Sequence, residues 1–358
     1  MSTWPDRRIL DLLGIELPIL QAPMAGASGS SMAIAVGNAG GLGALPCALL
    51  TLDQVRAEID AFRAACQGPL NLNFFCHQPP APDSERDARW KHALKPYYDE
   101  LGADFTAPTP VSNRAPFDEH SCQLVEAMRP QVVSFHFGLP EADLLRRVKA
   151  SGAKVISSAT TVEEALWLEA HGCDAIIAMG YEAGGHRGMF LTESIHSQIG
   201  TFALVPQVVD AVKVPVIAAG GIGDHRGLAA ALALGAAAVQ VGTAYLFTPQ
   251  AKVSPAHRQA LDNAPASDTA LTNLFTGRLA RGINNRIMRE LGPVSDLAPR
   301  FPLAGGALMP LRAISEPHQS SDFSNLWAGQ GLRLGRMMDA GTLTRRIAEG
   351  APGSPSPR

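Results

Sequence analysis

Glycine-containing pairs follow three successive apolar runs of the chain and have the chemistry of a phosphate site. Glycine has no side chain, so the backbone N–H groups beside it can approach an anion closely. Each pair alone could equally end a tight turn, but its recurrence after three runs favours binding of a phosphate at a helix N-terminus. The pairs are Gly184–Gly185 after the run 175–179, Gly220–Gly221 after 214–219, and Gly242–Thr243 at the end of 238–242.

Two further segments suit a flat ring attached to that phosphate. Pro23, Met24 and Ala25 place a backbone turn and a flexible side chain after the first apolar run. Asn73 offers an amide that can bind a carbonyl, an N–H or a hydroxyl group. These residues fit flavin mononucleotide (FMN), but a sugar phosphate or another phosphorylated metabolite fits the phosphate half equally well. The residues alone leave both kinds of ligand open.

Two histidines, one at the end of an apolar run and one in the loop after another run, are candidates for proton transfer. His136 lies between two phenylalanines at the end of an apolar run, where a histidine is often a core residue. The strand end and the following Gly138 favour an imidazole that faces the site and acts as a general base near neutral pH. His186, in the loop after the run 175–179, either supports that loop or contacts substrate. Tyr181 in the same loop either packs or contacts substrate.

Composition and missing motifs exclude several classes. Apolar residues make up 46% and charged residues 18% of the 358, and 30 Lys and Arg against 33 Asp and Glu give a net charge of −3. A nucleic-acid or anionic-membrane protein needs a basic excess. Five cysteines without a C-x-x-C pair predict a reducing, cytoplasmic setting and no zinc site. No H-x-x-x-H, H-E-x-x-H or carboxylate cluster predicts a metal, and no G-x-S-x-G predicts a serine hydrolase.

Two segments have features to compare with those of a membrane span or a signal peptide. The stretch 228–247 has no charge and is long enough to cross a bilayer. It is mostly Ala and Gly, however, and it divides into a helical half and a β-rich half. Residues 1–11 are polar and charged, unlike a signal peptide. We therefore expect no membrane partner.

The elements that must position these residues alternate between short apolar runs and helical segments. Runs that are apolar on both faces and alternate with helices predict a parallel sheet covered by helices. Eight runs in about 230 residues predict an α/β fold of the (β/α)8 TIM-barrel type, in which function collects at the C-terminal strand ends. An open doubly wound sheet is the alternative, but no G-x-G-x-x-G follows the first run. The runs are 18–23, 41–45, 69–74, 132–136, 154–159, 175–179, 214–219 and 238–242.

The alternation stops near residue 250 and divides the chain. We expect a barrel at 15–250, with an insertion at about 78–117 that is rich in proline and charge. Residues 251–350 are expected to form a smaller helical and loop-rich subdomain that covers the substrate and packs with the insertion. Residues 351–358 are expected to be a disordered tail.

Five motifs together resemble the nitronate monooxygenases, formerly called 2-nitropropane dioxygenases. The resemblance covers about residues 15–250 and extends to the segment 275–282. The E-A-G-G-H-R-G run and the H-F-G strand end are its most specific parts. The motifs are Gln21-Ala-Pro-Met-Ala-Gly26, Ser134-Phe-His-Phe-Gly138, Glu182-Ala-Gly-Gly-His-Arg-Gly188, Ala219-Gly-Gly-Ile222 and Gln240-Val-Gly-Thr243.

The resemblance implies an FMN-dependent barrel that oxidises alkyl nitronates, typically propionate 3-nitronate, with O2. The products are a carbonyl compound and nitrite, formed after one-electron transfer to the flavin, and His136 matches the family's catalytic base. Met179 stands where the family often has a flavin-contacting Gln. The family's flavin contacts match Met24, Asn73, Gly184, Gly221, Gln240, Val241, Gly242 and Thr243. The turn after the first run and the glycine pairs add Pro23, Ala25, Gly185 and Gly220 to the expected cofactor site, and Met179 enters it from the resemblance.

The sequence leaves other functions open. An NAD(P)H-dependent FMN reductase of the quinone or enoyl-acyl carrier protein type would have a similar barrel. A flavin-free phosphosugar isomerase is a further alternative, whereas an IMP-dehydrogenase-like enzyme needs a cysteine that residues 180–198 lack. A non-enzymatic binding module is disfavoured because many polar groups converge on one face. The expected partners are a small nitronate and O2, and the expected assembly is a monomer or homodimer.

Overall fold

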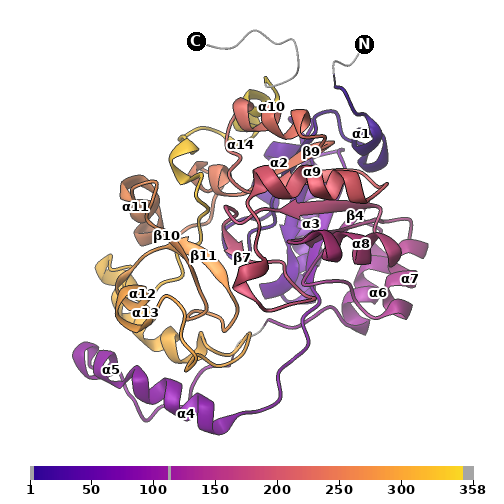
Figure 1. The fold of residues 1–358 in the computed structure, drawn as a ribbon. Helices are drawn as coiled ribbons and strands as arrows, with labels where there is room; N and C mark the ends of the chain where they lie inside the picture. The colour runs from indigo at the N-terminus through magenta and orange to yellow at the C-terminus, as the bar shows by residue number, and fades with distance from the viewer. Residues whose placement is uncertain (1–3, 112–113, 350–358) are drawn as a thin grey trace.

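Eight parallel strands form a closed barrel (Figure 1). The computed structural model describes residues 4–111 and 114–349, so the tail expected at 351–358 lies outside the described residues. The hydrogen-bonded order is β1-β9-β8-β6-β5-β4-β3-β2, and a parallel bridge between Leu20 and Leu42 joins β1 to the start of β2. The eight predicted strands are confirmed. They are β1 (Ile19–Gln21), β2 (Gly43–Pro46), β3 (Leu70–Phe75), β4 (Val132–His136), β5 (Lys154–Ala159), β6 (Ala175–Met179), β8 (Val216–Ala219) and β9 (Ala238–Val241).

Neighbouring residues of a strand belong to two different cores. Val155 packs in the core between the strands and the helices, whereas Ile156 fills the core inside the barrel. Both faces of the strands are therefore buried, which explains why the sequence shows continuous apolar runs rather than alternation. The short helix α1 (Arg8–Leu13) adds Leu10 and Leu13 to the inner core.

Helices surround the barrel, and the expected (β/α)8 fold is confirmed. The helix α3 (Leu52–Ala65) begins at a capping box formed by Thr51 and Gln54. The chain returns to the barrel at its end, where α14 packs against α2, α10 and β1 although the sequence analysis grouped it with the covering part. The surrounding helices are α2 (Ser30–Gly37), α3 (Leu52–Ala65), α6 (Glu119–Met128), α7 (Ala142–Ala150), α8 (Val162–Ala170), α9 (Thr201–Ala211), α10 (His225–Ala233) and α14 (Ala340–Ala348).

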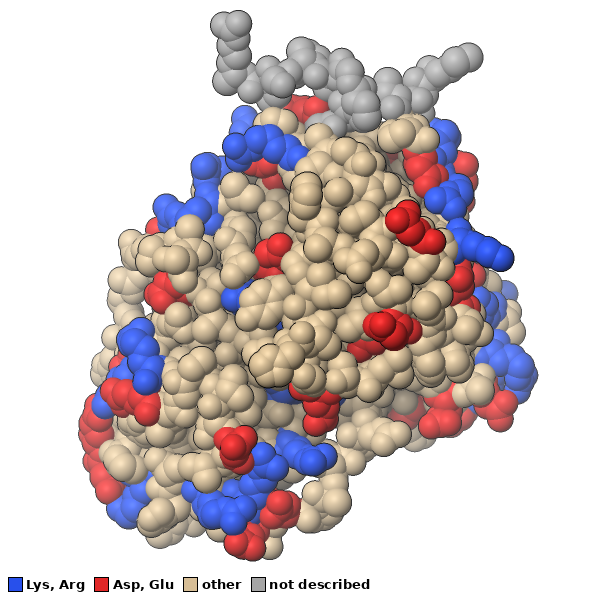
Figure 2. Space-filling model, in the orientation of Figure 1, with Lys and Arg blue, Asp and Glu red and all other residues tan. Residues whose placement is uncertain are grey.

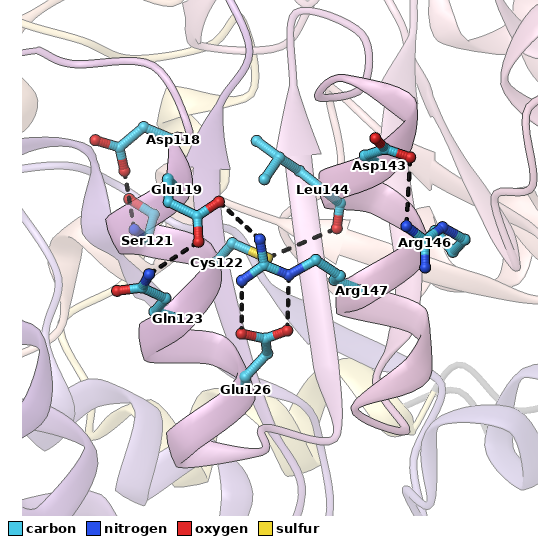
Figure 3. A network of polar contacts seen from close by, with 10 residues as sticks. All are labelled: Asp118, Glu119, Ser121, Cys122, Gln123, Glu126, Asp143, Leu144, Arg146 and Arg147. Carbon is cyan, nitrogen blue, oxygen red and sulfur yellow. Dashed lines mark hydrogen bonds and ion pairs between the residues drawn. The ribbon is translucent and has the colours of Figure 1, made fainter.

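An ion-pair network links two of these helices on the outside of the barrel (Figure 3). Arg147 of α7 binds Glu126 of α6 through two parallel hydrogen bonds of 2.8 Å. Its third nitrogen donates to Glu119 at 2.7 Å, and Gln123 donates to the same carboxylate at 2.9 Å. The planar guanidinium thus spans two turns of α6 and fixes how the two helices lie against each other.

The insertion and the C-terminal part share a hydrophobic core. Two insertion helices, α4 (Ser84–Ala93) and α5 (Lys95–Leu101), lie beside α12 and α13 (Figure 1). The indole N–H of Trp90 donates to the carbonyl of Ala304 at 2.9 Å, and the Tyr98 hydroxyl donates to Ala307 at 2.7 Å. Both side chains are buried among residues of the C-terminal part.

The C-terminal part also contains two strands that the sequence analysis did not predict. β10 and β11 form an antiparallel sheet with β7 (Gly185–His186), a two-residue strand in the loop after β6. This sheet joins the C-terminal part to the barrel loop that carries the glycine pair. The elements are α11 (Pro255–Asn263), β10 (Thr269–Thr272), β11 (Ala280–Ile283), α12 (Arg286–Leu291) and α13 (Met309–Ser315).

Helix length, surface charge and the placement of possible metal ligands are the remaining features of the fold. Among the described residues, none of the helices is long and apolar enough to cross a membrane. The uncharged stretch 228–247 is divided among α10, β9 and a short 3-10 helix. On the face shown in Figure 2, Lys and Arg side chains are interspersed with Asp and Glu. Within 4–111 and 114–349, no three His, Cys, Asp or Glu side chains are placed to hold a metal ion.

Candidate active site

One cavity opens at the C-terminal ends of the barrel strands and is covered by the C-terminal part. Its floor comes from the loops after β1, β6, β8 and β9, and from side chains of β3 and β4. Fourteen of the residues predicted from the sequence line it together. They are Pro23, Met24, Ala25, Asn73, His136, Met179, Gly184, Gly185, His186, Gly220, Gly221, Gln240, Gly242 and Thr243.

Two predicted site residues do not line this cavity. Val241 follows Gln240 on β9, so its side chain points to the opposite face and is buried in the core against the helices. Tyr181 turns away from the cavity, and its ring lies 4.5 Å from the guanidinium of Arg281. Neither side chain faces the cavity, because a side chain next to a site residue in sequence need not share its face; a backbone contact of Val241 with the cofactor stays a prediction.

The loops after β8 and β9 present backbone donors to the cavity. Gly220 and Gly221 have φ angles of 113° and 72°, a left-handed conformation that favours glycine. Within the described part of the chain, the N–H groups of Gly221 and Gly242 donate no hydrogen bond. The Thr243 hydroxyl accepts a 2.8 Å bond from the Gly329 N–H, which leaves its own proton to donate. This arrangement is suited to an anion with several oxygens.

Polar side chains on β3 and β9 face the same cavity. Asn73 is buried, and its amide nitrogen donates to the backbone and side-chain oxygens of Ser134 at 3.2 and 3.0 Å. The side-chain oxygen of Gln240 is buried and has no partner among the described residues. A buried acceptor without a donor is costly, so it marks a place where a ligand N–H or O–H would be stabilised.

The loop after β6 is held by a buried arginine. Arg187 is fully buried and donates to the carbonyls of Gly180 and Met179 at 2.7 and 2.8 Å, and to the side chain of Gln198 at 2.7 Å. Burial, and then the charge of Arg281, lower the pKa of Arg187 to about 10. The guanidinium is still charged at neutral pH, and its hydrogen bonds fix the loop on the end of β6.

A carboxylate at the other end of that loop also has a positioning role. Glu182 accepts bonds of 2.8 Å from both the N–H and the hydroxyl of Thr201, at the start of α9. A Cβ on Gly184 would lie 2.5 Å from the nitrogen of Gly329. Backbone therefore packs against backbone here, and only glycine allows the C-terminal part to approach the loop so closely.

The two nitrogens of His136 have different partners. Nε2 lies 3.1 Å from the carbonyl oxygen of His186, and Nδ1 lies 3.0 Å from the hydroxyl oxygen of Ser158. A carbonyl only accepts, so the proton is on Nε2 and the lone pair of Nδ1 accepts the Ser158 O–H. Burial is the main cause that lowers the pKa of His136 to about 4; the His186 bond opposes it, and the charges of Arg278 and Arg187 add to it. The imidazole is neutral at pH 7.

His186 supports the loop after β6 and also faces the cavity, so its contact with substrate stays a prediction. Its ring lines the cavity, and its Nε2 lies 2.9 Å from the hydroxyl of Thr276. Its backbone pairs with Ala280 of β11. Burial, and then the positive charge of Arg114, lower its pKa well below the ordinary value. The ring is thus neutral and anchored to the C-terminal part.

Several cavity residues were not predicted, because the C-terminal part has no motif that marks them. Lys252, in the C-terminal part, lines the cavity and pairs with Glu58 at 3.1 Å. Arg278 lies 4.1 Å from the ring of Phe137, and Arg281 is buried. The unpredicted residues include Phe75, Arg114, Ser158, His257, Arg312, Asn325, Trp327, Gly329 and Gly331.

Comparison with known proteins identifies the family of the chain. A family model described as nitronate monooxygenase matches residues 6–350. The nitronate monooxygenase of Pseudomonas aeruginosa is 42% identical over 346 residues, which are 96% of this chain and 98% of the relative. That of Paraburkholderia phytofirmans is 40% identical, with 95% and 94% covered.

Two solved structures share the fold of this chain over nearly its whole length. The nitroalkane oxidase from Streptomyces ansochromogenes superposes with a TM-score of 0.85 at 36% identity, covering 96% of this chain and 98% of that one. FabK from Thermotoga maritima superposes with a TM-score of 0.72 at 28% identity, covering 96% and 95%. The chain is therefore an oxidoreductase that belongs to the nitronate monooxygenase family.

Proposed function

We propose that this enzyme binds FMN and oxidises alkyl nitronates of the propionate 3-nitronate type with O2, giving a carbonyl compound and nitrite. The observation that carries the proposal is the position of His136 in the same cavity as the free N–H groups of Gly221 and Gly242. Family membership supports the oxidation of nitronates in general. When bound, FMN would accept electrons from the nitronate one at a time and pass them to O2.

The residues of the cavity fit FMN. The Gly221 and Gly242 N–H groups and the Thr243 hydroxyl would hold its phosphate. Gln240 supports the fit, because its buried oxygen lacks a partner and the flavin ring and ribityl chain carry N–H and O–H donors. Met24 and Asn73 would lie against the ring. Met179 has no side-chain donor, so this chain would bind the ring with one hydrogen bond fewer than a relative with Gln there.

His136 would serve as the base when the substrate is a neutral nitroalkane. Its Nδ1 lone pair takes the α-proton: the C–H bond breaks, an N–H bond forms, and the electron pair of carbon moves onto the nitro group. The Ser158 hydroxyl, which holds Nδ1 at 3.0 Å, would turn to another acceptor. Nε2 stays bonded to the His186 carbonyl, so the resulting imidazolium keeps its orientation. A preformed nitronate needs no such step.

The visible spectrum of the purified protein tests the cofactor first. We expect a flavin spectrum that changes when propionate 3-nitronate is added without O2 and that does not respond to NADPH. Restoring O2 should return the original spectrum and release nitrite. Loss of absorbance with NADPH and none with nitronate would instead establish the flavin reductase alternative. A protein that takes up no FMN would contradict the proposed cofactor.

A further inference from the structure

The chain turns sharply directly after His136, the last residue of β4. Phe137 has a φ angle of 71°, a left-handed conformation that residues other than glycine rarely adopt. In a regular strand, successive side chains point to opposite faces. Here the turn brings the two rings together, with 4.5 Å between their centres. The conformation of Phe137 therefore affects where the imidazole lies, and the surrounding side chains must hold it.

A buried cluster encloses the ring of Phe137. Phe75 and Phe301 contact it in edge-to-face geometry, with ring centres 5.0 and 5.4 Å away. The guanidinium of Arg278, two residues before β11, lies over the ring at 4.1 Å from its centre. A cation is attracted to the face of an aromatic ring, and the attraction is stronger away from water. Arg278 thus holds the residue that follows His136.

Arg278 also holds a second segment that contacts the imidazole. Its guanidinium donates to the carbonyl of Met189, in the loop after β6. A Cβ on the preceding Gly188 would lie 3.0 Å from Cε1 of His136, so the backbone packs directly against the ring there. One side chain of the C-terminal part therefore ties together the two segments that contact His136.

The position of Arg278 is costly for the stability of the fold. Its Nε is buried and has no partner within the described part of the chain. A buried donor without an acceptor destabilises a protein, whereas an apolar side chain of similar length would fill the space without that cost. Residues that break such a rule occur at functional sites. The charge of Arg278 is therefore expected to have a function.

We propose that Arg278 is a positioning residue for proton removal: through its contact with Phe137 it fixes the orientation of the His136 imidazole. The inference rests on the proposed function, because it takes His136 to be the base. Arg278 is not among the residues that line the cavity, so it acts on the substrate only through its neighbours. The bond to Met189 reinforces the same orientation from the loop after β6.

The charge of Arg278 gives this role a signature in the pH dependence. The guanidinium and the imidazole lie 4.1 and 4.5 Å from the centre of one ring. They are thus no more than about 9 Å apart, where two unit charges at an effective dielectric constant of about 20 change a pKa by about one unit. Burial lowers the pKa of His136 most, and the charge of Arg278 lowers it further. Removing that charge favours the imidazolium and should raise the pKa.

Other charged and titratable groups surround the imidazole, and the variants below leave them in place. Burial lowers the pKa of Arg278, whereas the charges of Glu193 and Glu164 oppose that effect, so the guanidinium is charged at neutral pH. Glu164 also accepts the Phe190 N–H at 2.6 Å. The groups around His136 are His77 after β3, Arg114 in the insertion, Glu164 of α8, His186 and Arg187 in the loop after β6, and Arg278 before β11.

Substrate choice and pH dependence test the role together. We expect Arg278→Met to lower kcat/KM for nitroethane by about 10- to 100-fold, because a small misplacement of a catalytic group is costly. Turnover of the nitronate made from nitroethane should change by less than about 3-fold. The pH below which kcat/KM for nitroethane falls should rise from about 4 to about 5. Arg278→Lys keeps the charge but loses the flat contact with Phe137, so it should slow nitroethane oxidation without moving that pH.

The matched control is Arg286→Met. Arg286 also lies over an aromatic ring, 5.4 Å from the centre of Tyr97, and it pairs with Glu100 away from the cavity. This control should leave both substrates and the pH profile unchanged. Equal losses on both substrates in Arg278→Met, or a pH midpoint that does not move, would overturn the proposal.

A double-mutant cycle tests whether Arg278 acts through Phe137. Phe137→Leu keeps an apolar side chain but removes the face on which the guanidinium lies. The losses of Phe137→Leu and Arg278→Lys in kcat/KM for nitroethane should then not be additive, and the double variant should be about as slow as the slower single one. Additive losses would contradict the proposed route.

An NMR titration of the His136 imidazole tests the contact without turnover. The FMN-loaded protein carries histidine with a 13C-labelled ring, and the His136 signal is the one missing from His136→Asn. From pH 8 to pH 4, this signal should titrate about one pH unit higher in Arg278→Met than in the unmodified protein, and should not shift in Arg278→Lys or Arg286→Met. An unchanged midpoint in Arg278→Met would contradict the proposal. If neither nitroethane nor its nitronate is oxidised, the proposed function fails, whereas this titration still decides whether Arg278 acts on His136.

Discussion

Replacing His136 with asparagine should separate the two kinds of substrate. An asparagine amide can keep the contacts of the ring with Ser158 and the His186 carbonyl, but it has no basic lone pair. Oxidation of a neutral nitroalkane needs removal of a proton from carbon, whereas a preformed nitronate has already lost it. We therefore expect His136→Asn to slow nitroethane oxidation far more than oxidation of the nitronate made from it.

The size of the effect follows from the environment of the ring. A positioned general base contributes about 10²- to 10⁴-fold to a rate. His136 is a weak base, because burial and neighbouring arginines lower its pKa to about 4. A weak base gives less driving force for proton transfer, so we expect a loss of about 10²-fold on nitroethane, at the lower end of that range. Loss on the nitronate should stay within about 3-fold.

The pH dependence of kcat/KM for nitroethane tests which protonation state of His136 acts as the base. The base works in its neutral form, which predominates above a pKa of about 4. With nitroethane, kcat/KM should therefore be constant from pH 5 to pH 8 and should fall only below about pH 4. The assay is initial-rate O2 consumption with each substrate in wild type and variant. Equal losses on both substrates, or a midpoint near 6.5 in the wild type, would refute this role of His136.

Three other perturbations test how the site is held. Gly184→Ala places a Cβ 2.5 Å from backbone of the C-terminal part and should abolish flavin retention in gel filtration, whereas Gly68→Ala, whose nearest neighbour is 3.4 Å away, should not. Trp90→Phe leaves the Ala304 carbonyl without its donor and should lower the free energy of unfolding by about 1–3 kcal/mol in urea titrations. Acid should also destabilise the fold, because histidines with a folded pKa below the unfolded value of about 6.5 favour unfolding as pH falls. The free energy of unfolding from urea titrations should therefore drop by about 1–2 kcal/mol per histidine between pH 7 and pH 5. The histidines whose pKa is lowered to about 4 are His77, His136 and His257.

The barrel was predictable because its signal is local. A strand buried on both faces must be apolar at successive positions, as at Ala175–Met179, and a helix such as Leu52–Ala65 carries its own cap. The strand β7 carries no such signal: it has two residues, Gly185 and His186, and it exists only because β11 pairs with it across about a hundred residues of chain. Periodicity does not report a pairing of that kind.

The residues of the candidate site differ in the same way in how far the sequence predicts them. Residues at strand ends, such as His136 and Gly221, were found because the fold brings all C-terminal strand ends to one edge. His257 and Arg312 lie on helices whose apolar positions face a separate core, and nothing in their neighbours in sequence marks them. They line the cavity because the C-terminal part folds over the strand ends.

The floor of the cavity and its cover are supported separately, which determines what substitutions in each can change. The floor residues are held by the barrel through Arg187 and by the strand ends themselves, so their geometry does not depend on the residue types of α11 and α13. The cover reaches the floor through backbone contacts, at the sheet of β7 with β11 and at Gly184 against Gly329. Backbone contacts tolerate exchange of the side chains beside them. Substitutions in α11 and α13 of the cover should therefore alter the shape and charge of the cavity wall while the chemistry at His136 stays the same.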